Sequence, residues 1–255
     1  MNTINVHFIN CTCKEDACEK VQKLYKSAIR DLTGIKSEET VIIPWMASAD
    51  NIYAYNHWMK DYVNPRSPSD GKRKYKVGDA VIQTINNAYV PCARVTNTLQ
   101  DLIARPFNLT LREPANSSYD LFSTRYTHFG VYACEKGTVV AVDAEREILR
   151  VYFDAGYIAD YRFGPEVQML DFAYATSLNR LEGRTCKAII FDAWEMEEMY
   201  MTNPLFAKLI ASAEKEVYIL GDNISLDEIK SKMSAIPEIR NRINIDENHI
   251  CFPIY

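Results

Sequence analysis

Residues 170–192 consist of two apolar runs joined by a polar hinge, and this pattern constrains the fold more than any other stretch. Residues 188–191 are apolar and too few for a helix, which favours a strand buried on both faces. Residues 173–181 carry good helix formers, and Gly183 stands where such a helix would end. Strand, helix, glycine and strand in this order predict an α/β fold with a parallel sheet.

The first 63 residues show the same alternation of strands and helices. Residues 4–9 alternate as in a strand, residues 16–32 place apolar side chains on one helix face, and residues 40–43 form a second strand before Pro44. Residues 51–63 predict another helix. We therefore expect the beginning of the chain and the region beyond residue 170 to share one parallel sheet.

The middle of the chain has the shorter period of antiparallel strands. Residues 80–85, 138–142, 148–153 and 158–163 alternate apolar and polar side chains, and a polar turn joins the second of these to the third. Residues 66–76 form a basic linker rich in turn residues. That linker is either a solvated loop or a phosphate-contacting patch, because it holds the densest positive charge in the chain.

Composition limits the classes of function. The chain has 255 residues and a net charge of −5, so nucleic acid would have to be attracted by a local patch. No run approaches the roughly 20 apolar residues of a membrane span, and the first residues do not resemble a signal peptide. The seven cysteines are scattered, which favours a reducing compartment; we expect an intracellular protein, cytoplasmic or nuclear.

Two clusters raise the question of a metal site. Cys11, Cys13 and Cys18 lie close in sequence, but their spacing matches no standard zinc site. The acidic residues after the last apolar run form either a metal cluster or a solvated helix face: Asp192, Glu195, Glu197 and Glu198. We expect the solvated face, and therefore no bound metal.

Residues 88–131, together with the adjoining Tyr132, combine aromatic side chains with arginines. The aromatic residues are Tyr89, Phe107, Tyr119, Phe122, Tyr126, Phe129 and Tyr132, and the arginines are Arg94, Arg105, Arg112 and Arg125. Such a set can stack on the bases of a single strand, or it can form a small core or a protein interface. The sequence leaves both interpretations open.

Three segments carry a family resemblance. Residues 75–87 are YKVGDAVIQTINN, residues 173–183 are AYATSLNRLEG, and residues 203–222 are NPLFAKLIASAEKEVYILGD. In this order and spacing they resemble motifs of superfamily 1 DNA helicases of the RecD-like branch, in a degenerate form of the C-terminal region. The resemblance implies a RecA-like α/β domain with an inserted small β-barrel. It also implies about forty extra residues at 88–131, beyond ordinary loop lengths.

The resemblance implies domain boundaries and site residues. The RecA-like domain would comprise residues 1–70 and 168–225, the barrel 71–167, and a polar tail 226–255. Nucleic acid would contact Lys72, Arg73, Lys74, Gln83, Asn86, Thr176, Asn179 and Arg180. The degenerate nucleotide-site positions would be Glu182, Gly183 and Ser212.

The parts that hydrolyse ATP are missing from the sequence. None of the nine glycines belongs to a G-x-x-x-x-G-K-[ST] phosphate loop, and Ser212 stands where the helicases carry an arginine. We therefore expect no ATPase activity from this chain alone, and no cofactor. ATP and magnesium would be needed only with a domain that supplies a phosphate loop.

Three functions agree with these observations. The first is a helicase-like protein that binds single-stranded nucleic acid or a protein partner such as a replication component. The second is the C-terminal portion of an ATP-dependent DNA helicase whose phosphate loop lies on another segment or subunit. The third is a module that binds only protein. None of the three involves a membrane.

Overall fold

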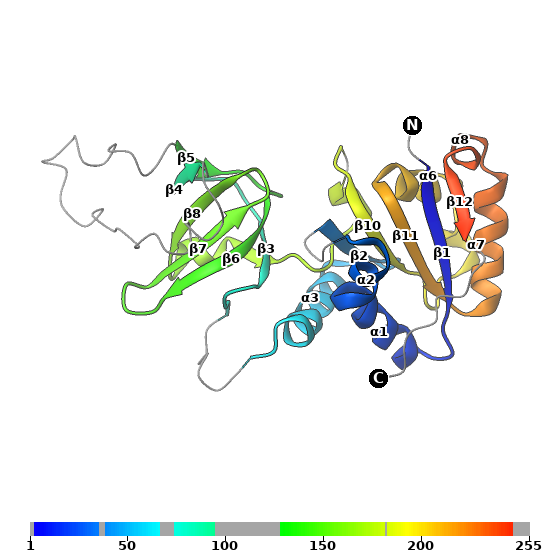
Figure 1. Ribbon diagram of the computed structural model, residues 1–255, viewed down its shortest axis with the longest axis horizontal. Helices are drawn as coiled ribbons and strands as arrows, with labels where there is room; N and C mark the ends of the chain where they lie inside the picture. Colours follow the sequence, from blue (N-terminus) through cyan, green and yellow to red (C-terminus); the bar gives the residue numbers. More distant parts are fainter. Residues whose placement is uncertain (1–2, 36–38, 67–73, 95–127, 182, 247–255) are drawn as a thin grey trace, which may run out of the picture. The chain divides into compact units, whose positions relative to one another are not determined.

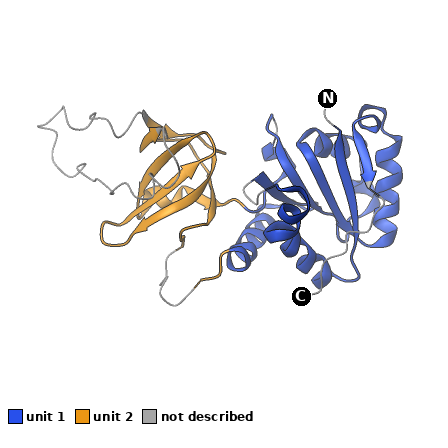
Figure 2. Cartoon of the chain, viewed as in Figure 1, with its two compact units in different colours: residues 1–63, 174–255 blue, residues 64–173 orange. Residues whose placement is uncertain are grey.

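The computed structural model describes residues 3–35, 39–66, 74–94, 128–181 and 183–246 (Figure 1). The chain divides into two compact units (Figure 2). Unit 1 comprises residues 1–63 and 174–255, and unit 2 comprises residues 64–173. Unit 2 is therefore an insertion in the sequence of unit 1.

Unit 1 is built on a parallel sheet of five strands. Their order is β12 (Ile243–Asp246), β1 (Ile4–Asn10), β11 (Ala213–Gly221), β10 (Cys186–Asp192) and β2 (Thr40–Pro44). All four neighbouring pairs run parallel. The predicted parallel sheet that joins the start of the chain to the region beyond residue 170 is therefore confirmed. The stretch expected to be a tail, 226–255, supplies its edge strand β12.

Helices cover both faces of this sheet. One face carries α1 (Lys14–Lys23), the π-helix η1 (Leu24–Ala28), α2 (Ile29–Thr33) and α3 (Ala49–Val63). The other carries α6 (Asn203–Ala211), α7 (Asn223–Ala235) and α8 (Pro237–Arg240). The core on the second face contains Phe191, Phe206 and Ile229. Because side chains alternate along a strand, Asp192 points to the face of α1 and α3.

The prediction of a helix over residues 173–181 is wrong. After β9 (Leu170–Phe172) the chain forms an isolated bridge between Ala175 and Ile42, then a short 3-10 helix, η5 (Leu178–Leu181). The Asn56 side chain accepts a hydrogen bond from Ala175 N at 2.8 Å and donates one to Ala175 O at 3.1 Å. These tertiary bonds satisfy backbone groups that a helix would have paired internally. Gly183 has a φ of 75°, a left-handed value that glycine adopts without strain.

Unit 2 is an antiparallel sheet of seven strands, drawn curled in Figure 1. Its order is β5 (His128–Val131), β4 (Asn87–Arg94), β8 (Tyr157–Arg162), β7 (Ile148–Phe153), β6 (Lys136–Asp143), β3 (Ala80–Gln83) and β9, and α5 (Pro165–Gln168) precedes β9. The predicted α/β class with an inserted antiparallel sheet is confirmed. Of the segment 88–131, the ends belong to β4 and β5, and residues 95–127, with most of the aromatic side chains and arginines named above, lie outside the described residues.

Two positions in the sheet of unit 2 are packed especially tightly. Gly137 has no room for a side chain, because a Cβ there would lie 2.5 Å from Tyr152 O. Arg150 on β7 and Asp160 on β8 form a buried bidentate ion pair, with bonds of 2.7 and 2.8 Å. Among the described helices of the whole chain, none is long and apolar enough to cross a membrane.

Candidate functional site

The residues of unit 2 that were predicted to bind nucleic acid differ in exposure. Gln83 is fully buried; its side chain donates to Ile85 O at 2.7 Å and accepts from the Tyr161 hydroxyl at 2.7 Å. These contacts hold the sheet together. Asn86 is exposed, and its Oδ1 accepts a hydrogen bond from Ala133 N at 2.8 Å. Lys74 is exposed and donates to Leu170 O at 3.1 Å, and partial burial lowers its pKa.

The predicted residues of unit 1 gather on and beside η5. Thr176 is buried, and its backbone N–H donates to Ile42 O. Asn179 and Arg180 are exposed, and Asn179 Oδ1 accepts from Lys208 Nζ at 3.0 Å. Of these three residues, Asn179 and Arg180 therefore present side chains to solvent. Lys72 and Arg73 lie outside the described residues.

Of the positions matched to the helicase nucleotide site, Ser212 makes contacts within unit 1. Ser212 is buried at the end of α6, and its hydroxyl donates to Lys208 O at 2.9 Å. Its carbonyl accepts from Cys186 N at 2.9 Å, which links α6 to the start of β10. A hydroxyl that caps a helix cannot supply the positive charge of an arginine. Gly183 precedes β10, and Glu182 lies outside the described residues.

Aromatic side chains project from the paired strands β4 and β5 and the turn after β5. The exposed fractions are 84% for Tyr89, 45% for Phe129 and 70% for Tyr132. Pro91 pairs with Phe129, and Asn87 pairs with Val131, with a shift of register between these two pairs, so Tyr89 and Phe129 lie on paired strands and Tyr132 follows directly after β5. We call Tyr89, Phe129 and Tyr132 the β4–β5 aromatic surface. Large apolar groups exposed together usually mark a binding surface.

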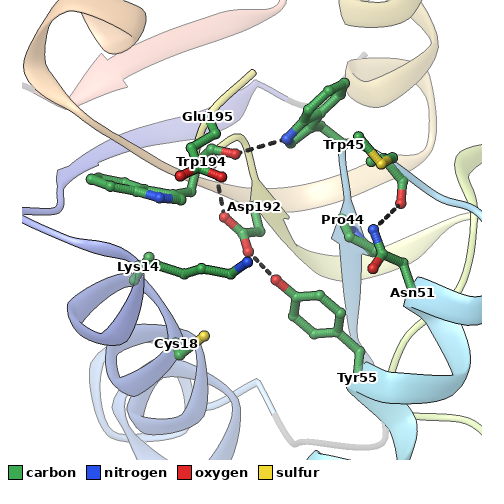
Figure 3. A pocket seen from close by; sticks show the side chains of 11 residues that line it. Lys14, Cys18, Pro44, Trp45, Asn51, Tyr55, Asp192, Trp194 and Glu195 are labelled. Atoms are coloured by element: carbon green, nitrogen blue, oxygen red, sulfur yellow. Dashed lines mark hydrogen bonds between the residues drawn. The ribbon is translucent and has the colours of Figure 1, made fainter. Parts of the chain in front are cut away.

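A pocket of about 250 Å³ lies in unit 1, at the carboxyl ends of β2 and β10 (Figure 3). It is lined by Lys14, Ala17, Cys18, Pro44, Trp45, Met46, Asn51, Tyr55, Asp192, Trp194 and Glu195. The chain leaves β2 toward α3 on one face of the sheet and leaves β10 toward α6 on the other. Such a switch point, outside the carboxyl ends of parallel strands, is where α/β proteins bind ligands.

The buried carboxylate of Asp192 lies at the centre of the pocket, and the side chain is only 6% exposed. Oδ1 accepts from Trp194 N at 3.0 Å, and Oδ2 accepts from the Tyr55 hydroxyl. Figure 3 shows the Lys14 ammonium pointing toward the same carboxylate. Burial raises the pKa of Asp192, although these hydrogen bonds and the charge of Lys14 act in the opposite direction.

Replacing Asp192 with asparagine is expected to stabilise the protein at neutral pH. The pKa of Asp192 is raised in the folded state, so folding becomes less favourable as pH rises above its ordinary value of 3.8 and through the folded pKa. The Asp192→Asn variant lacks this penalty, so its free energy of unfolding in urea should exceed that of the wild type at pH 7. The difference should shrink below pH 3.8.

The exposed carboxylate of Asp61 on α3 provides the matched control, because Asp61→Asn removes an equal charge outside the pocket. We expect this control to change the free energy of unfolding little at either pH. An Asp192→Asn variant less stable than the wild type at pH 7 would contradict the conclusion that folding raises the pKa of Asp192.

The four acidic residues at and after the end of β10 differ in exposure. Asp192 is buried, while Glu195, Glu197 and Glu198 are exposed, as a solvated face requires. In the part of the chain that the structure describes, no group of His, Cys, Asp and Glu side chains is arranged to hold a metal ion. The pocket could not be predicted from the sequence, because its residues lie far apart in the chain: Tyr55 is 137 residues from Asp192.

The fold and pocket define an α/β protein with a ligand-sized cavity at the carboxyl edge of its parallel sheet. No family model matches the sequence, and no curated protein matches it.

Pif1 helicases are among the solved structures that share some similarity with the chain. The helicase from Bacteroides in complex with ADP-AlF3 and ssDNA is 12% identical, with a TM-score of 0.38, over 88% of this chain and 51% of that one. Bacteroides Pif1 bound to ssDNA is 12% identical, with a TM-score of 0.36, over 84% and 53%. The chain thus spans about half the length of these proteins. They are Pif1 helicases and do not show the RecD-like branch, and TM-scores this low do not establish a family.

Proposed function

We propose that this chain is a helicase-like module that binds single-stranded nucleic acid and does not hydrolyse ATP by itself. The observation that carries the proposal is the β4–β5 aromatic surface. Tyrosine and phenylalanine rings that stand exposed on a sheet can stack on successive unpaired bases, whatever the base sequence. The resemblance of residues 75–87 and 173–183 to helicase motifs points to the same ligand.

A protein partner is the second candidate, because exposed aromatic side chains also anchor protein interfaces. The two candidates differ in their dependence on salt. Binding to a nucleic-acid backbone releases counterions, so its affinity falls steeply as the salt concentration rises. A contact between apolar protein surfaces has no such dependence.

Removing four basic side chains is expected to flatten this salt dependence. The variant replaces Lys72, Arg73, Lys74 and Arg180 with glutamine. Each phosphate contact contributes about 0.7 to the slope of log affinity against log salt for a single strand, so the slope should fall by up to about 3. Fluorescence anisotropy with a labelled oligonucleotide, repeated at several salt concentrations, measures both slopes.

The control variant carries four equivalent replacements of exposed side chains elsewhere in unit 1, at Lys26, Arg30, Lys215 and Arg240. Its slope should match that of the wild type. Equal slopes for the wild type and the first variant would remove these four residues from the site. Wild-type affinity that does not change with salt would favour the protein partner.

The proposed absence of ATPase activity concerns the chain alone. The sequence lacks a phosphate loop, and Ser212 caps a helix where an arginine would be needed. ATP turnover by the purified chain would overturn the proposal. Turnover that appears only after addition of a protein carrying a phosphate loop would instead identify the chain as the C-terminal portion of a helicase.

A further inference from the structure

The pocket at the carboxyl edge of the unit 1 sheet is separate from the positions that the helicase resemblance implies. Gly183 precedes the first residue of β10, and Ser212 immediately precedes β11, so both lie at the amino ends of their strands. Asp192 is the last residue of β10. A ligand in the pocket would therefore occupy the opposite edge of the sheet from the nucleotide-site positions.

Three charged side chains line the pocket, and burial decides which of them selects the ligand. Lys14 and Glu195 are exposed, whereas Asp192 is buried. Water and salt screen the first two charges, while a charge in a low-dielectric interior acts strongly on anything placed beside it. A cation bound in the pocket would therefore interact most strongly with Asp192.

The Asp192 carboxylate keeps hydrogen-bonding capacity for a ligand. An ionised carboxylate has about four acceptor positions. Among the described residues, Trp194 N donates to one oxygen and the Tyr55 hydroxyl donates to the other. The remaining positions suit a group with several N–H donors. Burying a carboxylate without a full counter-charge is unfavourable, and a bound cation would remove that penalty.

Aromatic and apolar side chains form the rest of the wall. Trp45, Tyr55 and Trp194 line the cavity together with Met46. Trp45 Nε1 donates to Trp194 O at 2.7 Å, which links the two tryptophan-bearing loops. Electron-rich ring faces attract ammonium and guanidinium groups. The volume of about 250 Å³ is below the range of drug-sized sites, so it admits a small molecule or one side chain.

We propose that this pocket binds a small organic cation, an ammonium or guanidinium group on a short apolar stem, with Asp192 as its counter-ion. The Asp192 carboxylate receives the N–H donors, the tryptophan and tyrosine rings surround the charge, and Met46 contacts the stem. Lys14, which points at the same carboxylate, competes with the ligand for it. This site is independent of the proposed binding of single strands.

Three probes of nearly equal shape test the sign of the ligand charge: n-pentylamine, n-pentanol and pentanoate. Two of the three tryptophans of the chain line the pocket, so intrinsic fluorescence reports occupancy. We expect saturable binding of pentylamine at neutral pH, at least tenfold tighter than that of pentanol, and no saturable binding of pentanoate. Pentanoate binding at least as tightly as pentylamine would overturn the proposal.

Two substitutions should change the affinity for pentylamine in opposite directions, which damage to the fold cannot imitate. Asp192→Asn keeps the size of the side chain and removes the charge, so affinity should fall at least tenfold. Lys14→Met removes the competing ammonium from an exposed position, so affinity should rise several-fold. Asp61→Asn, outside the pocket, should leave the affinity unchanged. Weaker binding of pentylamine by Lys14→Met would refute Lys14 as a competitor, and unchanged binding by Asp192→Asn would refute Asp192 as the counter-ion; either result would overturn the proposal.

The same titration distinguishes the two sources of such a cation. Nα-acetyl-lysine methylamide presents the lysine side chain as a partner protein would, and pentylamine represents a free amine. Binding of the blocked lysine at least as tight as that of pentylamine supports a basic side chain of a partner. Binding of pentylamine alone supports a free metabolite, and the failure of both overturns the proposal. Single-strand binding should be unaffected by Asp192→Asn, so the two proposals fail separately.

Discussion

Replacing both Tyr89 and Tyr132 with alanine is expected to lower the affinity for single-stranded DNA by at least about 30-fold. Each base stacked on an aromatic ring contributes about 1–3 kcal/mol, and 1.4 kcal/mol corresponds to a factor of ten. Both rings are mostly exposed, at 84% and 70%, so their removal should not disturb the core. Fluorescence anisotropy at one fixed salt concentration measures the change.

Two control variants test the stacking interpretation. Tyr53 on α3 is also exposed, at 59%, but belongs to unit 1, so Tyr53→Ala should bind like the wild type. Replacing Tyr89 and Tyr132 with phenylalanine keeps the rings and removes the hydroxyls, and should retain most of the affinity. Undiminished binding by the alanine variant would exclude the β4–β5 aromatic surface as the site, and equal losses for both double variants would exclude stacking.

The second large effect concerns stability. Replacing Arg150 with alanine is expected to lower the free energy of unfolding by about 3–5 kcal/mol, because it leaves the Asp160 carboxylate buried without its bidentate partner. Both side chains are almost completely buried between β7 and β8. Urea titration followed by circular dichroism measures the loss.

A double variant isolates the cause of this effect. Replacing Arg150 with methionine and Asp160 with leucine removes both charges and keeps the volume filled, so stability should return close to that of the wild type or exceed it. A double variant as unstable as Arg150→Ala would mean that the shape of these side chains, and not the unpaired charge, determines the loss.

The strands were predictable because their apolar alternation is local. β1, β2, β7 and β10 are buried in patterns that their own residues specify, and the polar turn between β6 and β7 marks their hairpin. Gly183 has the left-handed φ of 75° that favours glycine, although the helix over 173–181 that it was predicted to end is absent. These features depend on neighbours in the sequence.

The predictions that were wrong or missing concern residues whose hydrogen-bond partners lie far away in the sequence. Residues 173–181 contain good helix formers, but Asn56, 119 residues before Ala175, holds them in an extended bridge. Gln83 was grouped with binding residues because of its motif, yet Tyr161, 78 residues later, fixes it inside the sheet. The pocket needs α1, α3 and β10 to meet, and no local pattern records that meeting.

The order of strands in unit 1 has a consequence for synthesis on the ribosome. β1 pairs with β11 and β12, and β2 pairs with β10, so both early strands wait for partners that are translated after unit 2. The ladders of unit 2 join strands within one continuous segment and can close sooner. β2 lacks its partner until residues 186–192 have been synthesised, and β1 lacks its partners until residues 213–221 and 243–246 follow, so the backbone groups of both edges stay open to pairing with other chains for most of translation.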